Sequence, residues 1–79
     1  MRASVLIRPK EGILDPQGQA VEQSLRKLGF DVGHARIGRV VDFDVSAASP
    51  EEARERVDEM CKQLLANPLI ESYEVKVHP

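Results

Sequence analysis

The sequence predicts an α+β domain of two layers, in which two helices lie on one face of an antiparallel sheet of three to four strands. Apolar residues alternate with polar ones near the start, the middle and the end of the chain, as in half-buried strands. Two segments between them carry apolar residues at helical spacing, and each opens with a capping residue followed by proline. The resulting order, β-α-β(β)-α-β, is related to the ferredoxin-like plan.

The first strand is predicted at 3–10. Ala3, Val5 and Ile7 alternate and would share its apolar face. Pro9 ends the run, because proline cannot donate to a ladder of backbone hydrogen bonds.

The first helix is predicted at 16–28. Asp15 is a good N-cap and Pro16 a good first helical residue. Gly29 and Phe30 fit a Schellman ending, in which the glycine takes a positive φ and the next residue packs back on the helix. One face of this helix is apolar and comprises Val21, Leu25 and Leu28.

The middle of the chain allows two arrangements. Six of its apolar residues fall at odd positions: Ala35, Ile37, Val41, Phe43, Val45 and Ala47. One arrangement is a single long strand bent near Gly38, and the other is a hairpin with a three-residue loop at 38–40. A two-residue loop at Gly38-Arg39 is disfavoured, because it would place Asp42 among the apolar residues. A straight strand over this whole segment would span roughly 46 Å, which is longer than a domain of this size. We therefore expect a bend, or an arm that reaches a second subunit.

The second helix carries the clearest signals. Ser49 and Glu52 form a capping box around Pro50, and Pro68 stops the helix. Its predicted buried stripe is Ala53, Val57, Met60, Cys61 and Leu64. A last strand follows, with Tyr73, Val75 and Val77 on one face.

Composition limits the function. The chain has 79 residues and a net charge of −2, and we expect it to form a single domain, 1–79. Its charges are interspersed and only three residues are aromatic, so no basic stripe or stacking platform indicates nucleic-acid binding. No apolar run is long enough for a membrane span, and no signal peptide is evident. With a single cysteine, these features lead us to expect a cytoplasmic protein that gains stability by forming a homo-oligomer.

The sequence offers little chemistry. His34 and His78 lack metal-ligand spacing, and Cys61 lies on an apolar stripe. Asp42 and Asp44 fit an exposed strand face. The segments 15–18 and 37–39 contain glycine but do not match phosphate-binding loops. We therefore predict no catalytic, cofactor or metal site on this chain.

Four motifs, taken together, resemble the PurS family, the small subunit of phosphoribosylformylglycinamidine synthase. They are LDPQG at 14–18, LGF at 28–30, IGR at 37–39 and LLANPLIESYEV at 64–75. The resemblance covers essentially the whole chain in the right order. Family members usually carry lysine where this chain has Arg39, and the two side chains hydrogen-bond differently.

The resemblance implies a non-catalytic assembly subunit of de novo purine biosynthesis. The family's complex converts formylglycinamide ribonucleotide, glutamine and ATP to the amidine. Its glutaminase subunit, PurQ, releases ammonia, and its synthetase subunit, PurL, uses ATP and magnesium. The small subunit forms a homodimer or tetramer and bridges the other two, so that ammonia passes between them. It binds no cofactor itself.

Candidate contacts with partners lie in the motif loops: Asp15, Gly18, Gly38, Arg39, Asn67 and Pro68. Arg39 is the one least explained by folding, so Arg39→Glu is expected to leave the fold intact and weaken assembly. Two other hypotheses stay open. One is a small-ligand regulatory module of ferredoxin-like type, and the other is a small enzyme that uses Asp42, Asp44 or His34.

Overall fold

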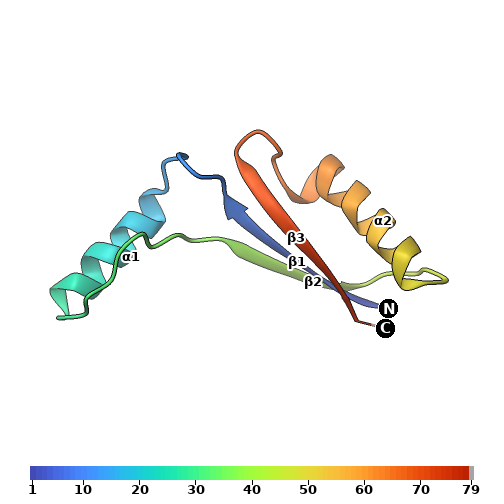
Figure 1. Ribbon diagram of the computed structural model, residues 1–79, viewed down its shortest axis with the longest axis horizontal. Coiled ribbons are helices and arrows are strands. Elements are labelled where there is room, and N and C mark those ends of the chain that lie inside the picture. The colour runs from blue at the N-terminus through green and yellow to red at the C-terminus, as the bar shows by residue number, and fades with distance from the viewer. Residues whose placement is uncertain (79) are drawn as a thin grey trace.

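The computed structural model describes residues 1–78, so Pro79 at the end of the predicted last strand lies outside the described residues. Three strands and two helices follow each other along the chain (Figure 1). The predicted α+β class, with an antiparallel sheet and two helices, is confirmed. The elements are β1 (Arg2–Pro9), α1 (Pro16–Lys27), β2 (Arg39–Asp44), α2 (Pro50–Met60) with a π-helical end η1 (Cys61–Leu65), and β3 (Glu71–His78). No helix in residues 1–78 is long and apolar enough to cross a bilayer.

The sheet has the order β2-β1-β3, and β1 runs antiparallel to both neighbours. Val5 at the centre of β1 lies opposite Val41 on one side and Val75 on the other. The hairpin prediction is therefore wrong, because β2 pairs with β1 and not with residues 35–37. The long-strand prediction holds only for 39–44. Before Gly38 the backbone hydrogen-bonds to side chains of α1 instead of to another strand.

The core is a single layer between the sheet and α2. Its centre consists of side chains with at most 1 % exposure: Ala3, Val5 and Ile7 from β1, Ala53 and Val57 from α2, and Cys61 from η1. Alternation along β1 and helical spacing along α2 bring these two sets face to face. The core is small, as expected for a chain of this length.

The π-helical end of α2 changes which residues are buried. A π turn holds more residues than an α turn, so it rotates the positions that follow it. Leu64, within this end, is 83 % exposed, and its predicted place in the buried stripe is wrong. The prediction is also wrong for Met60, which is 37 % exposed but lies before the π-helical end, in α2 itself. Ala66, at 7 % exposure, takes part in the core in their place.

Helix α1 does not lie on the sheet in this chain. Figure 1 shows it extending from the end of the sheet, while α2 covers one face. Three strands about 4.8 Å apart give a face roughly one helix diameter wide, so α2 alone fills it. The predicted placement of both helices on one face of the same sheet needed a fourth strand that residues 1–78 lack. The chain is elongated as a result. Its radius of gyration is 15.7 Å, against about 12 Å for a compact domain of this length.

The predicted ends of α1 are confirmed. Asp15 accepts a hydrogen bond from the Gly18 backbone N–H at 2.9 Å. At the other end Gly29 has a φ of +97°, and the Phe30 N–H donates to the Leu25 carbonyl at 3.0 Å, as in a Schellman motif. These caps use only neighbouring residues, which explains why the sequence predicts them.

Gly38 marks the point where the chain leaves α1 and enters the sheet. A Cβ built on Gly38 would lie 2.3 Å from the carbonyl oxygen of Ile7. No side chain fits at that distance from backbone, so the position needs glycine if β2 is to start beside β1.

We predict that Gly38→Ala lowers the free energy of unfolding by about 1–3 kcal/mol, because the methyl group collides with rigid backbone. Urea denaturation followed by circular dichroism measures this loss. Gly33→Ala is the matched control, since its Cβ would meet only the end of the Arg26 side chain at 3.7 Å. Equal stability of the two variants would contradict the packing argument.

Candidate functional site

A charged clamp joins the start of β2 to the start of β3 across the end of β1. The Arg39 guanidinium donates to both carboxylate oxygens of Glu71, at 2.6 and 3.1 Å, and to the Leu65 carbonyl at 2.7 Å. The same carboxylate accepts from the Asn67 backbone N–H at 2.7 Å. The clamp therefore ties the last turn of η1, the following loop and both edge strands together.

The hydrogen bonds of the clamp also shift the pKa values of its two side chains. The bidentate bond from Arg39, and then the Asn67 N–H, lower the pKa of Glu71 below its usual value. The hydrogen bond to Glu71 raises the pKa of Arg39. Glu71 is only 16 % exposed, so water screens this pair less than an ordinary surface ion pair.

The turn that follows η1 is held rigidly by Asn67. Its carbonyl accepts from the backbone N–H groups of Ile70 and Glu71, and its side-chain oxygen accepts from the Leu69 N–H at 3.1 Å. Leu69 is nevertheless 82 % exposed, and Leu64 at the end of η1 is 83 % exposed. We call these two leucines, with Asn67 and Pro68, the turn surface. Apolar side chains on such an ordered backbone are suited to contact another protein, since little entropy is lost on binding.

A second set of polar contacts holds α1 to the returning segment 30–38. Asp15 accepts from the Ile37 N–H at 2.8 Å, and Glu22 accepts from the Ala35 N–H at 3.0 Å. Arg26 donates to the Val32 carbonyl at 2.8 Å. These three contacts hold α1 and the segment together, and we call the two the arm.

Hydrogen bonds from backbone N–H groups lower the pKa values of the two carboxylates of this arm. The pKa of Asp15 is lowered first by the Gly18 N–H and then by the Ile37 N–H. The pKa of Glu22 is lowered chiefly by the Ala35 N–H. Gly18 is buried because the returning segment passes close to it, and a Cβ on Gly18 would lie 2.5 Å from the Ala35 carbonyl oxygen.

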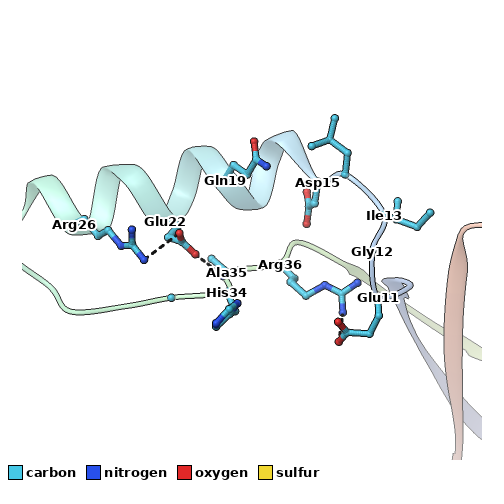
Figure 2. Close-up of a pocket in the computed structure, with 12 residues that line it drawn as sticks. Glu11, Gly12, Ile13, Asp15, Gln19, Glu22, Arg26, His34, Ala35 and Arg36 are labelled. Carbon is cyan, nitrogen blue, oxygen red and sulfur yellow. Dashed lines mark hydrogen bonds and ion pairs between the residues drawn. The ribbon is translucent and has the colours of Figure 1, made fainter.

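An open hollow of about 600 Å³ lies between α1 and the returning segment. Figure 2 shows its charged side chains turned toward partners within the chain. Glu22 pairs with Arg26 at 3.3 Å, and Arg36 contacts Glu11 and the Pro9 carbonyl. A ligand site usually offers a few free polar groups that converge on one point. Here those groups already bind each other, so the hollow gives little support to the small-ligand hypothesis.

The groups considered for catalysis do not come together. His34 lies in the arm, at a φ of +56°, whereas Cys61 is fully buried in the core, where burial raises the pKa of its thiol. Tyr73 donates to Asp58, which raises the pKa of Tyr73 to about 12 and ties β3 to α2. Within residues 1–78 no group of three His, Cys, Asp or Glu side chains is placed to hold a metal ion.

What the chain does build is a rigid turn with exposed leucines and an arm whose apolar face is uncovered. Val21 is 40 % and Leu28 73 % exposed on that face. Together with the small α+β body, these features define a domain of the kind that associates with other chains. The chain belongs to the PurS family of phosphoribosylformylglycinamidine (FGAM) synthase subunits, whose sequence model matches residues 2–79. It is thus a PurS-type subunit of purine biosynthesis.

Similar proteins support the assignment over nearly the full length. The PurS subunit of Archaeoglobus fulgidus is 45 % identical over 76 residues, which cover 95 % of each chain. The crystal structure of Methanocaldococcus jannaschii PurS superposes with a TM-score of 0.85 at 40 % identity, covering 98 % of this chain and 94 % of that one. A chain in the structure of PurLQS from Thermotoga maritima superposes with a TM-score of 0.88 at 33 % identity, covering 95 % and 93 %.

The six interface candidates fall into two places. Asp15, Gly18 and Gly38 lie where the arm joins the body, and each has a structural role there. Arg39 and Asn67 meet in the clamp, and Pro68 is in the exposed turn beside it. The view that folding does not explain Arg39 is wrong, because its three hydrogen bonds are within the chain. Contact of any of the six with a partner stays a prediction.

Sequence reasoning missed Glu71 and Glu22, which complete the two sets of polar contacts. One signal was available for Glu71. It stands at an odd position at the start of the last strand, in phase with Tyr73, so it shares the core face with Arg39 across β1. A charged residue in phase with the core indicates a partner of opposite charge.

The clamp predicts a pH-dependent part of the stability. Because the pKa of Glu71 is lower in the folded state, its contribution is present above the unfolded value near 4.5 and is lost as the pH falls through the folded pKa. We expect Glu71→Gln to be less stable than the parent at pH 7 and to lose less stability on acidification. Denaturation midpoints between pH 3 and 7 measure this, with the exposed Glu55→Gln as control.

The same clamp revises the expectation for Arg39→Glu. Two carboxylates would then face each other, so we expect about 1–2 kcal/mol lower stability at pH 7. The exposed Arg54→Glu in α2 changes the charge equally and is the control. Parent-like stability of Arg39→Glu would contradict a structural role of the clamp.

Proposed function

We propose that this chain is the non-catalytic assembly subunit of an FGAM synthase complex, joining a glutaminase subunit to a synthetase subunit so that ammonia passes between them. The observation that carries the proposal is the superposition on a chain of the Thermotoga maritima PurLQS structure. The exposed turn surface and the uncovered arm support a role in contacts between chains. ATP, magnesium and glutamine would act on the partner subunits, and this chain would bind none of them.

The proposal also covers the cellular setting and the self-association of the chain. We place the complex in the cytoplasm, where an unpaired thiol such as that of Cys61 stays reduced. We infer that the apolar face of α1 is buried against a second copy. The face is amphipathic and uncovered, while Val41 and Phe43 of the sheet are only partly buried. An arm from one copy can cover what α2 leaves open on the other.

The proposed role is tested by reconstitution. We expect the synthetase and glutaminase subunits to produce FGAM from glutamine at full rate only with this chain present. With ammonium as the nitrogen source, the synthetase should need it much less, because no ammonia has to be transferred between subunits. Equal glutamine-dependent rates with and without the chain would refute the proposal. Calorimetry of the chain alone against purine nucleotides and amino acids tests the ligand-module alternative, which a saturable signal would favour.

The turn surface can be tested in the same system. Leu69→Asp should weaken binding to the partner subunits by about tenfold or more, because a buried charge would replace an apolar anchor. Its fold should be unaffected, as the side chain is 82 % exposed. Val40→Asp is the control, since Val40 is a similarly accessible apolar residue, 59 % exposed, outside the turn surface.

The proposed arm contact makes a separate prediction. Leu28→Asp should shift the chain toward a smaller oligomer in sedimentation velocity, because the charge would be buried against the second copy. Leu69→Asp serves as the control and should keep the parent's oligomeric state. If Leu28→Asp sediments like the parent at every concentration, the arm is not the contact.

A further inference from the structure

The exposure of Leu64 depends on the helical register at the end of α2. An α-helical register would place Leu64, three residues after the buried Cys61, on the core face of the helix. The π register of η1 instead closes with a hydrogen bond from the Ala66 N–H to the Cys61 carbonyl at 3.0 Å. Ala66 is then buried and Leu64 is exposed. The register therefore decides whether Leu64 belongs to the core or to the turn surface.

Burial of apolar side chains does not explain the π register. It places an alanine in the core and leaves a leucine in solvent, although burial of the larger side chain would remove more apolar area from water. A π turn is also rare, and it occurs frequently at functional sites. We therefore looked for the contacts that hold this end of the helix in its observed register.

Two hydrogen bonds of the clamp act directly on the π turn. Arg39 donates to the Leu65 carbonyl at 2.7 Å, and Glu71 accepts from the Asn67 N–H at 2.7 Å. The Leu65 carbonyl belongs to the same peptide group as the Ala66 N–H that closes the π turn. Because a peptide group is planar, its C=O and N–H turn together. By fixing the carbonyl, Arg39 also fixes the direction of that N–H.

The contacts to the helix end add to those that already join the two charged side chains. Arg39 and Glu71 bind each other through two hydrogen bonds across β1. The same Nη2 atom of Arg39 also binds Leu65, and the same Oε1 atom of Glu71 also binds Asn67. The ion pair therefore holds the peptide groups on both sides of Ala66.

We propose that Arg39 and Glu71 are positioning residues for partner binding: they hold the end of α2 in the π register and so keep Leu64 on the turn surface. Neither residue has to touch a partner in this role, because Glu71 is partly buried and the Arg39 guanidinium is bonded within the chain. The part of the inference that concerns partner binding rests on the proposed function. The part that concerns the helical register is tested on the chain alone.

Solvent access to the methyl groups of Leu64 measures the register. In the parent chain a soluble paramagnetic gadolinium chelate should broaden the methyl NMR signals of Leu64 and Leu69 and leave those of the buried Val57 sharp. Arg39→Gln removes the guanidinium that binds the helix end, so we expect the broadening of Leu64 to be lost while Leu69 stays broadened. Glu71→Gln should change the signals in the same direction.

Val45→Ala is the control for a loss of stability alone. Val45 is buried, so the smaller side chain also weakens the core. It lies at the opposite end of the sheet from the clamp, where it exchanges hydrogen bonds with Met1. This variant should keep the parent's pattern of broadened signals, and circular dichroism verifies that each variant is folded.

The effect on partner binding is measured by titrating each chain into a mixture of the synthetase and glutaminase subunits. We expect Arg39→Gln to raise the chain concentration for half-maximal glutamine-dependent FGAM formation by about tenfold, as when a tenth of the molecules hold the competent register. The rate at saturation should equal that of the parent, because the bound chain is in the π register. Val45→Ala should match the parent in both quantities.

A double-mutant cycle shows whether the effect of Arg39 passes through Leu64. Leu64→Ala should weaken partner binding by itself, and Arg39→Gln should then add little, because no leucine remains to be positioned. In the Val45→Ala background, Arg39→Gln should keep its full effect.

The two parts of the inference fail separately. If no concentration of the parent chain restores the glutamine-dependent rate, the proposed function is refuted, and the methyl signals still decide whether the clamp holds the register. Equal broadening of Leu64 in the parent and in Arg39→Gln would overturn the inference. So would partner binding by Arg39→Gln that is no weaker than that of Val45→Ala.

Discussion

The narrow sheet is the constraint on which the rest of the structure depends. Three strands provide one apolar face about as wide as a single helix, and α2 occupies it with Ala53 and Val57. The second amphipathic helix therefore has no surface to cover in its own chain. Its position beyond the end of the sheet, the extended shape and the exposed Leu28 all follow from that shortage. The apolar face of α1 is thus left without an apolar surface to pack on in the described chain.

Polar contacts hold in place the segments that a larger apolar core would hold in a bigger domain. The arm is held by Asp15 and Glu22, and the junction after α2 is held by Glu71. In each case a carboxylate accepts a hydrogen bond from a backbone N–H group of a segment that has no strand partner. Such contacts fix direction as well as distance, because hydrogen bonds are sensitive to angle. They hold the turn surface and the arm in defined orientations on a body with few buried side chains.

The sequence predicts those parts of the fold that depend on neighbouring residues. The Asp15 cap, the Gly29 ending and the Ser49 cap involve residues within a few positions of each other, and each is found as expected. Contacts between distant residues could not be predicted in this way. Arg39 meets Glu71 only because of the register of two strands on either side of β1. The π turn has no recognisable sequence signal either, so the exposure of Leu64 was missed.

The central position of β1 has a consequence for how the chain folds. Val5 pairs with Val41 and with Val75, so the sheet closes only when distant parts of the chain meet. Topologies with many such contacts fold more slowly than local ones, because the entropy of the intervening loops is lost before the strands gain their contacts. During synthesis β1 is made first and can pair with β3 only after the last residues have been made. Both helices can form earlier, because their contacts are local. In that interval the edge of β1 that later pairs with β3 has no strand partner, and an unpaired edge makes the growing chain prone to aggregation.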